Sequence, residues 1–297
     1  MQGFACIGKG EKPLTDDILQ KAGVTAFCAY NKASAMARAA EIISQENDDC
    51  LCKVPFSNTI EAQQWGSQIS ISSIDNSVFI GNSAADKLET LNCLREWNLK
   101  SGPVREVLLA VRELAEADKN PVLNLNGPFS VLSMLTSASE LYRGLKRQPE
   151  LVKNLCTVII EQLVSYAREA VKNGAVIISY ADSVIVPGLI SPKLCSEICA
   201  PITLQAIKNI AAAVKNITVH VCSRTMGIIR DMPSYQIIEA DAAGMKYGKQ
   251  CCKYLVQRKK KESWLMAVCS SRGEGWNGEL SVSCSIEFNL LGSGIFD

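Results

Sequence analysis

The feature that most constrains the fold of this chain is an alternation of short apolar segments with longer amphipathic ones from residue 103 onward. Apolar residues at helical spacing predict helices, and short apolar runs bounded by glycine, asparagine or aspartate predict buried strands. The predicted helices cover 104–117, 150–173 and 201–215, and the predicted strands cover 121–125, 175–180, 217–222, 236–241 and 264–268. Residues 280–286 alternate between apolar and polar residues. The alternation of helices and strands is typical of α/β folds with parallel strands.

Two architectures share the pattern, an open doubly wound sheet and a (β/α)8 barrel. An open sheet usually carries a glycine-rich nucleotide motif after its first strand, and no such motif occurs near the start of this chain. Polar residues follow the predicted strands, where a barrel has its active site. We therefore expect one domain over 1–297, with an N-terminal helical extension over 1–60 and a (β/α)8 TIM barrel over 61–297.

Composition argues against two classes of partner. The chain has 31 lysines and arginines against 30 aspartates and glutamates, a net charge of +1, which does not favour a nucleic-acid binder. Its start has no apolar stretch of signal-peptide length. The most apolar windows are interrupted by Asp182 and by Lys208 with Lys215, so no membrane span is expected. We expect a cytoplasmic protein that binds neither nucleic acid nor membrane.

Thirteen cysteines stand against one histidine in this chain. Without a signal peptide a disulfide framework is not the expected use of cysteine, so most should be reduced thiols and some could be metal ligands. Any mechanism that needs an imidazole must use His220, because no other histidine exists.

His220 and Cys222 form the sharpest chemical motif, since residues i and i+2 of a strand project from the same face. Imidazole and thiolate together suit Zn²⁺, and a site of one histidine and two cysteines leaves an open position for substrate. The candidates for the third ligand, in order, are Cys269 at the end of a predicted strand, Cys284, and the adjacent Cys251 and Cys252. A core histidine beside a buried cysteine is the alternative that the spacing leaves open.

Several segments resemble the uroporphyrinogen decarboxylase superfamily, and within it the branch of corrinoid-dependent methyltransferases that act on coenzyme M and similar thiols. The resemblance follows one order along residues 15–235. The segments are VPFSNTIEAQQWG (54–66), NGPFSVLSML (126–135), PELVKNL (149–155), GAVIISYADSVIVPGLISPKLCSEICAPITLQAI (174–207) and VHVCSRTMGII (219–229).

The resemblance implies a (β/α)8 barrel that moves a methyl group between a methyl-corrinoid, presented by a corrinoid carrier protein, and a small thiol or tetrahydrofolate-type acceptor. It implies a zinc ion held by a His-x-Cys pair, which His220 and Cys222 match, and by a later cysteine, which Cys269 would match. The stretch between them is shorter than the family pattern, and the late Gly-Cys segment is not recognisable. The third ligand therefore stays open between Cys269 and Cys284.

Four further residues are candidates for supporting roles. Asp182 could orient a ligand histidine or bind the acceptor or cofactor, or it could cap the following turn. Tyr180 shares its strand face and could donate a hydrogen bond in catalysis, or it could be a packed tyrosine of the barrel. Glu239 could act in catalysis, be a fourth zinc ligand or be a solvent-facing carboxylate, and Asn126 could line the cofactor pocket or form an Asn-Gly turn.

Two other functions remain in view. A uroporphyrinogen decarboxylase-like enzyme would act on a tetrapyrrole without metal, but it would need arginine forks near its N-terminus, and Arg38 is the first arginine of this chain. A non-catalytic barrel could bind a corrinoid or a corrinoid protein without turnover. Metal content separates the methyltransferase from both.

Overall fold

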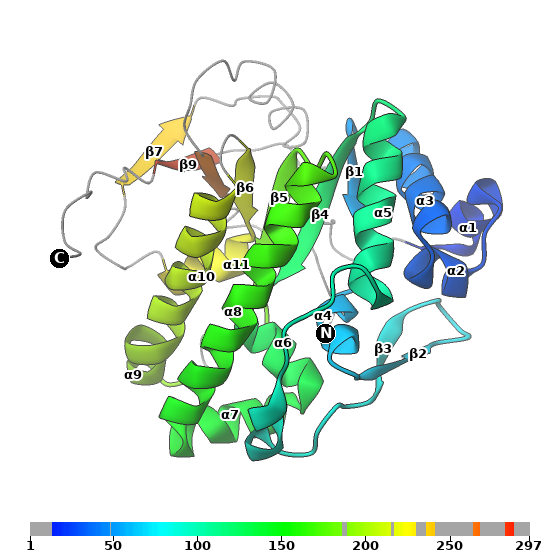
Figure 1. Cartoon of the computed structure of the whole chain (residues 1–297). Coiled ribbons are helices and arrows are strands. Elements are labelled where there is room, and N and C mark those ends of the chain that lie inside the picture. Colours follow the sequence, from blue (N-terminus) through cyan, green and yellow to red (C-terminus); the bar gives the residue numbers. More distant parts are fainter. Residues whose placement is uncertain are drawn as a thin grey trace.

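The computed structural model describes residues 14–47, 49–185, 189–214 and 217–229, together with the backbone of three later strands (Figure 1). The helices are α1 (Asp16–Ala22), α2 (Ala26–Asn31), α3 (Ala33–Glu46), α4 (Ile60–Gln64), α5 (Gly102–Glu116), α6 (Pro128–Leu135), α7 (Ala138–Arg147), α8 (Pro149–Lys172), α9 (Pro192–Leu194), α10 (Ala200–Ala213) and α11 (Ser223–Ile229), with a 3₁₀ segment η1 (Leu88–Cys93) and a π-helical turn η2 (Cys195–Cys199).

The main sheet has the strand order β1-β4-β5-β6-β8-β9-β7. Its strands are β1 (Leu51–Val54), β4 (Asn120–Asn126), β5 (Ile177–Ala181), β6 (Thr218–Val221), β7 (Gln236–Ala240), β8 (Trp264–Ala267) and β9 (Ser283–Glu287). Five strands, β1, β4, β5, β6 and β8, are parallel to their neighbours and follow chain order without a reversal, whereas β7 lies beyond β9 at the edge of the sheet. A doubly wound sheet reverses its order at a switch point. The unbroken progression is that of a barrel wall.

Helices α5, α8 and α10 lie side by side along one face of this wall (Figure 1). Strand residues that alternate along the wall pack under them in one large apolar core: Leu123, Leu125, Ile178, Tyr180, Val219 and Val221. The intervening strand residues project from the opposite face. Apolar and other side chains alternate along these strands. The apolar side chains pack under the helices on one face, so the opposite face is free to carry a functional site.

Two features differ from the sequence expectation. Strand β9 is antiparallel to both β8 and β7, whereas the alternation of helices and strands predicted a fold with parallel strands. Hydrophobic period reports burial and carries no information on strand direction. Strand β1 lies before residue 61 and pairs with β4, so the barrel wall begins inside the segment that was expected to be a helical extension.

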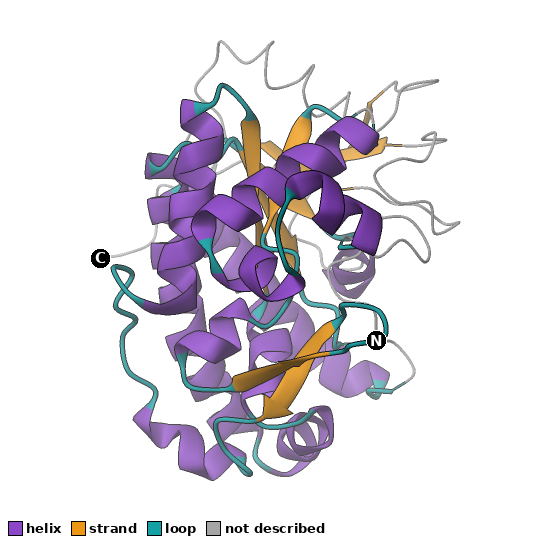
Figure 2. Ribbon diagram, turned by 90° about the vertical axis from the view of Figure 1, so that its right-hand side faces the viewer, coloured by secondary structure: helices purple, strands orange, loops and turns teal. Residues whose placement is uncertain are grey.

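Helices α1 to α3 form the expected N-terminal helical region. Thr15 caps α1 by accepting a hydrogen bond of 3.3 Å from the Ile18 amide. These helices share a second apolar cluster with the hairpin of β2 (Gln68–Ile71) and β3 (Val78–Asn82). Figure 2 shows that hairpin below the main sheet. Within the described residues, no helix is long and apolar enough to cross a membrane.

Candidate active site at the carboxyl ends of the strands

The face of the wall that is turned away from helices α5, α8 and α10 is polar near the carboxyl ends of its strands. Asn124 pairs in register with Ser179, and Ser179 with His220. The ladder continues past β6, because the Cys222 amide donates to the Tyr180 carbonyl at 2.9 Å. Cys222 therefore keeps the strand alternation and shares the face of His220. All these polar side chains are buried, together with Asn126 one step further along β4.

His220 is a neutral imidazole in this setting. Its side chain is fully buried, and burial lowers its pKa to about 3, with the positive charge of Lys53 as a smaller cause in the same direction. A neutral imidazole has a free electron pair on one ring nitrogen, which is the form that binds metal ions. Cys222 is buried beside it on the strand. One nitrogen and one sulfur donor on one face are a chemically fitting start for a zinc site.

The remaining proposed ligands come from the part of the chain after residue 229. Cys269, Cys251 and Cys252 fall outside the described residues. The backbone of β9 places Cys284 opposite Ala267 of β8 and opposite Glu239 of β7. Among the side chains that the structure describes, no group of three or more histidine, cysteine, aspartate or glutamate residues is arranged to hold a metal.

Asp182 caps the first turn of α6. Its carboxylate accepts hydrogen bonds from the Phe129 amide (3.2 Å), the Ser130 amide (2.7 Å) and the Ser130 hydroxyl (2.7 Å). Burial raises the pKa of Asp182 to about 6, although the hydrogen bonds from Ser130 and Phe129 act in the opposite direction. A carboxylate at a helix N-terminus is stabilised by the unpaired amides and the helix dipole. The capping role that the sequence left open is therefore present, for a helix on another part of the chain.

Tyr180 shares its face with Asp182, as the alternation predicted, but that face packs against α6. Tyr180 pairs in register with Val221 rather than with His220, and its side chain is fully buried in the apolar core. A β-carbon added to Gly127 would lie 2.4 Å from both the Tyr180 hydroxyl and an Asp182 carboxylate oxygen. The register of β5 against β6 therefore places Asp182 and Tyr180 on the face of the wall opposite to that of His220, so the structure does not bring these candidates together with His220.

Asn126 is held from two directions at the end of β4. Its side-chain nitrogen donates to the Asn58 carbonyl at 2.9 Å and to the Glu61 carboxylate at 2.6 Å. Its backbone amide donates to the other oxygen of Glu61 at 3.0 Å. Both amide hydrogens are therefore used, and the carbonyl oxygen receives no hydrogen bond from the described residues. This oxygen is the atom that Asn126 can offer to a ligand on the polar face.

Glu61 and Asn124 are parts of the site that sequence reasoning missed. Glu61 is almost fully buried, and burial raises its pKa to about 7 despite the hydrogen bonds from Asn126. Asn124 donates from its side chain to the Pro55 carbonyl at 3.0 Å, so the segment after β1 is tied to β4 at two levels. The only signal for Glu61 in the sequence was its place within a family-like segment, because a glutamate on a short helix is ordinarily solvated.

Comparison with known proteins places this chain in a family. The model of the family described as "Uroporphyrinogen decarboxylase (URO-D)" matches residues 14–261. The chain belongs to the uroporphyrinogen decarboxylase family. The resemblance seen in the sequence motifs is thereby confirmed.

Relatives of this uroporphyrinogen decarboxylase family member include two methyltransferases from species of Methanosarcina. "Methylcobamide:CoM methyltransferase MtaA" of Methanosarcina barkeri (strain Fusaro / DSM 804) is 28% identical over 131 residues, which are 43% of this chain and 37% of the relative. "Methylcobamide:CoM methyltransferase MtbA" of Methanosarcina mazei is 26% identical over 204 residues, 66% of this chain and 59% of the relative. The matches thus span less than two thirds of either relative.

A solved structure shows the fold of this family member. A "methyltransferase from Methanosarcina mazei" superposes with a TM-score of 0.62 at 15% identity, covering 88% of this chain and 87% of the other. The α/β barrel class expected from the sequence is confirmed.

Proposed function

We propose that this protein is a methyltransferase that moves a methyl group between a methyl-corrinoid, carried by a corrinoid protein, and a thiol or tetrahydrofolate-type acceptor held on zinc. The observation that carries the proposal is the His220–Cys222 pair, buried on the polar face at the carboxyl end of β6. The methyltransferase relatives support the reaction class.

The proposed zinc ligands are His220, Cys222 and Cys269, with Cys284 as the alternative third ligand and Glu239 as a candidate fourth. The donor set is of the nitrogen and sulfur type that Zn²⁺ prefers. A Zn²⁺ ion bound there would lower the pKa of an acceptor thiol, which is ordinarily near 8.5, so that the acceptor is a thiolate at neutral pH.

The residues of this chain position the acceptor and exclude water from the reaction. His220 and Cys222 would hold the zinc that binds the acceptor sulfur at the carboxyl end of β6, and the side-chain carbonyl oxygen of Asn126 would accept a hydrogen bond from the acceptor's polar part. Burial of this face keeps water away from the methyl group. In the reaction a carbon–sulfur bond forms while the cobalt–carbon bond breaks, the electron pair stays on cobalt, and the thiol proton is released to solvent.

In this proposal Asp182 and Tyr180 have a structural role. They seat the first turn of α6 against the end of β5, which holds Asn126 and Gly127 at the start of that helix. We assign neither residue a contact with the reacting atoms. This revises the supporting roles expected for them from the sequence.

Elemental analysis of the purified protein tests the proposal. One zinc per chain is expected in the wild type, none in Cys222→Ser, none in Cys269→Ser, and one in the control Cys156→Ser, whose thiol is buried among the helices. Zinc-loaded protein should then demethylate methylcobalamin when a thiol is added. The visible spectrum of the corrinoid measures this reaction.

Zinc that survives in Cys269→Ser would move the third ligand to Cys284 or to a carboxylate. Wild-type protein purified under reducing, chelator-free conditions that holds no zinc would overturn the zinc mechanism. The metal-free decarboxylase would then be assayed by loss of carboxylate from a porphyrinogen. A retained corrinoid spectrum without turnover would favour the non-catalytic barrel.

A further inference from the structure

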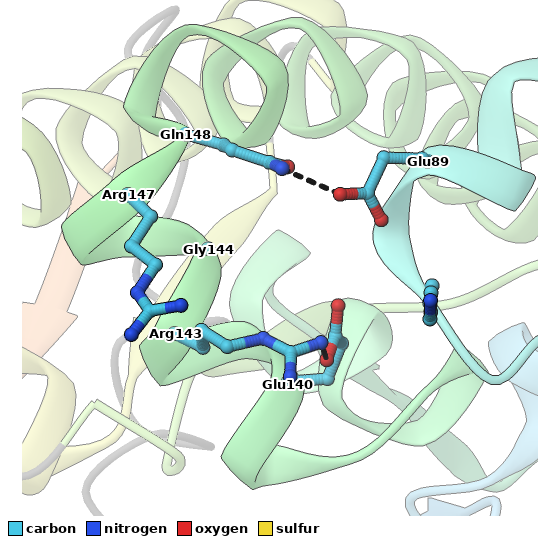
Figure 3. A pocket seen from close by; sticks show the side chains of 7 residues that line it. Glu89, Glu140, Arg143, Gly144, Arg147 and Gln148 are labelled. Carbon is cyan, nitrogen blue, oxygen red and sulfur yellow. Dashed lines mark hydrogen bonds and ion pairs between the residues drawn. The ribbon is translucent and has the colours of Figure 1, made fainter.

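A second candidate site lies away from the polar sheet face, between η1, α7 and the start of α8. It is a cavity of about 250 Å³, lined by Lys87, Glu89, Glu140, Arg143, Gly144, Arg147 and Gln148 (Figure 3). None of these residues belongs to a strand of the main sheet. The cavity is therefore separate from the proposed methyl-transfer site.

Close packing at Gly144 creates this cavity. A β-carbon at Gly144 would lie 2.2 Å from the Leu88 side chain, so only glycine lets η1 sit directly on α7. Leu88 is fully buried there, and the Leu88 amide donates to the Glu140 carboxylate at 3.3 Å. The two neighbours of Leu88, Lys87 and Glu89, are thereby carried to the rim of the cavity.

Both carboxylates of the lining already have a hydrogen-bonding partner within it. Glu140 forms an ion pair with Arg143. Glu89 accepts a hydrogen bond from the Gln148 side chain, which is the main reason why the pKa of Glu89 is lowered. Three cationic and two anionic side chains leave an excess of one positive charge (3 − 2 = +1). Among the described residues neither Lys87 nor Arg147 forms an ion pair within 4 Å, although the charge of Lys87 contributes to lowering the pKa of Glu89.

The arrangement of the cations favours an anionic occupant. Arg143 and Arg147 lie one turn apart on α7 with their guanidinium groups at the same cavity (Figure 3). Like charges at this spacing repel each other unless an anion lies between them. Gln148 is the N-cap residue of the 24-residue helix α8, yet its side chain makes no capping hydrogen bond because it is engaged with Glu89. The positive end of α8 adds to the same local field.

We propose that this cavity binds the phosphoryl group of a small phosphate ester. Guanidinium groups match phosphoryl oxygens through paired hydrogen bonds, and Lys87 supplies a point charge that a phosphoryl dianion would neutralise together with Arg147. Sites for drug-sized ligands measure about 300 to 1,000 Å³. A cavity of about 250 Å³ therefore suits a small ester better than a nucleotide. A polycarboxylate shares part of this chemistry and is an arm of the test below.

Isothermal titration of the full chain in a non-phosphate buffer at low ionic strength tests the proposal, with inorganic phosphate as the probe. We expect saturable binding of one phosphate per chain, weakened at least 10-fold in Arg147→Gln and in Lys87→Gln. The control Arg112→Gln removes the same charge from an exposed arginine of α5, which pairs with Glu116, and should bind as the wild type does. Circular dichroism verifies that each variant is folded.

Three results would overturn the proposal: no saturable binding to the wild type, equal weakening in Arg112→Gln and Arg147→Gln, or citrate binding more tightly than phosphate. The first two would show that no anion site exists, and the third would replace the phosphoryl group with a polycarboxylate. None of these results bears on methyl transfer or on zinc, because the variants lie outside that site.

Discussion

The buried carboxyl group of Glu61 makes the stability of the protein depend on pH. Its pKa is 4.5 in an unfolded chain and is raised by burial to about 7 in the folded state. The folded state thus binds this proton more tightly than the unfolded chain does. The associated stability is complete below pH 4.5 and is lost as the pH rises through 7.

We predict that the wild type loses about 3 kcal/mol more unfolding free energy between pH 4.5 and pH 8 than Glu61→Gln does, since each pKa unit corresponds to about 1.36 kcal/mol. Urea unfolding at the two pH values measures this difference. Glu116→Gln, which changes an exposed carboxylate, should follow the wild type. Identical pH dependence in the wild type and Glu61→Gln would contradict the burial argument.

Asp182 offers a second test at the same scale. Asp182→Asn replaces the charged acceptor of the first amides of α6, and we predict a loss of about 1 to 3 kcal/mol of unfolding free energy with unchanged zinc content. Ser130→Ala should cost less, because it removes one of the hydrogen bonds that reach this carboxylate. If Asp182→Asn kept full stability but lost methyl transfer, a direct catalytic role would replace the capping role.

At the scale of elements, the junction between β4 and α6 depends on a close approach. Gly127 leaves no room for a side chain beside Asp182 and Tyr180, since an added β-carbon would lie 2.4 Å from both. We predict that Gly127→Ala destabilises the protein by about 1 to 3 kcal/mol, because overpacking must displace α6 or the end of β5. Chemical denaturation measures the change.

Gly227→Ala is the matched control for Gly127→Ala. Nothing lies within 4 Å of a β-carbon added at Gly227, which is in α11. Alanine there should be neutral or stabilise by up to about 1 kcal/mol, because glycine is a poor helix former. Equal destabilisation by both substitutions would point to a general loss of glycine flexibility instead of a local collision.

The register of neighbouring strands decides which candidates meet. Alternation along β5 and β6 predicted correctly that Tyr180 shares a face with Asp182 and that His220 shares one with Cys222. It could not predict that the two pairs project from opposite faces, because pairing of Tyr180 with Val221 is a property of two strands together. A shift of one residue would have joined them.

At the scale of the whole molecule, zinc on His220 and Cys222 would link β6 to the later part of the chain. A ligand that binds only the folded state at 100 times its dissociation constant adds about 2.7 kcal/mol. We predict that a chelator lowers the melting temperature of the wild type by about 5 °C. Cys222→Ser should melt at the chelated temperature with or without chelator. A wild type insensitive to chelator would contradict a structural link through zinc.

Local pattern was sufficient for much of the fold. The period of the apolar residues predicted the positions of α5, α8, β4, β5 and β6, and family-like motifs predicted the barrel class. Neither the apolar period nor the motifs predicted that β9 is antiparallel to its neighbours or that β1 is a strand of the barrel wall. Both depend on strand pairing between segments far apart in the chain.

The sequence by itself determined the positions of the long helices α5 and α8 and of the strands β4, β5 and β6, the shared face of His220 and Cys222, and the family. These follow from local spacing, because side-chain direction repeats with a fixed period along helices and strands. Only the tertiary structure decided that Asp182 and Tyr180 pack against the start of α6 and that Glu61 is buried against Asn126. The same holds for the cationic side chains that lie together beside η1. Burial and charge balance depend on partners such as Glu61 and Asn126, which are 65 residues apart. Their contact is made only when the chain has closed on itself.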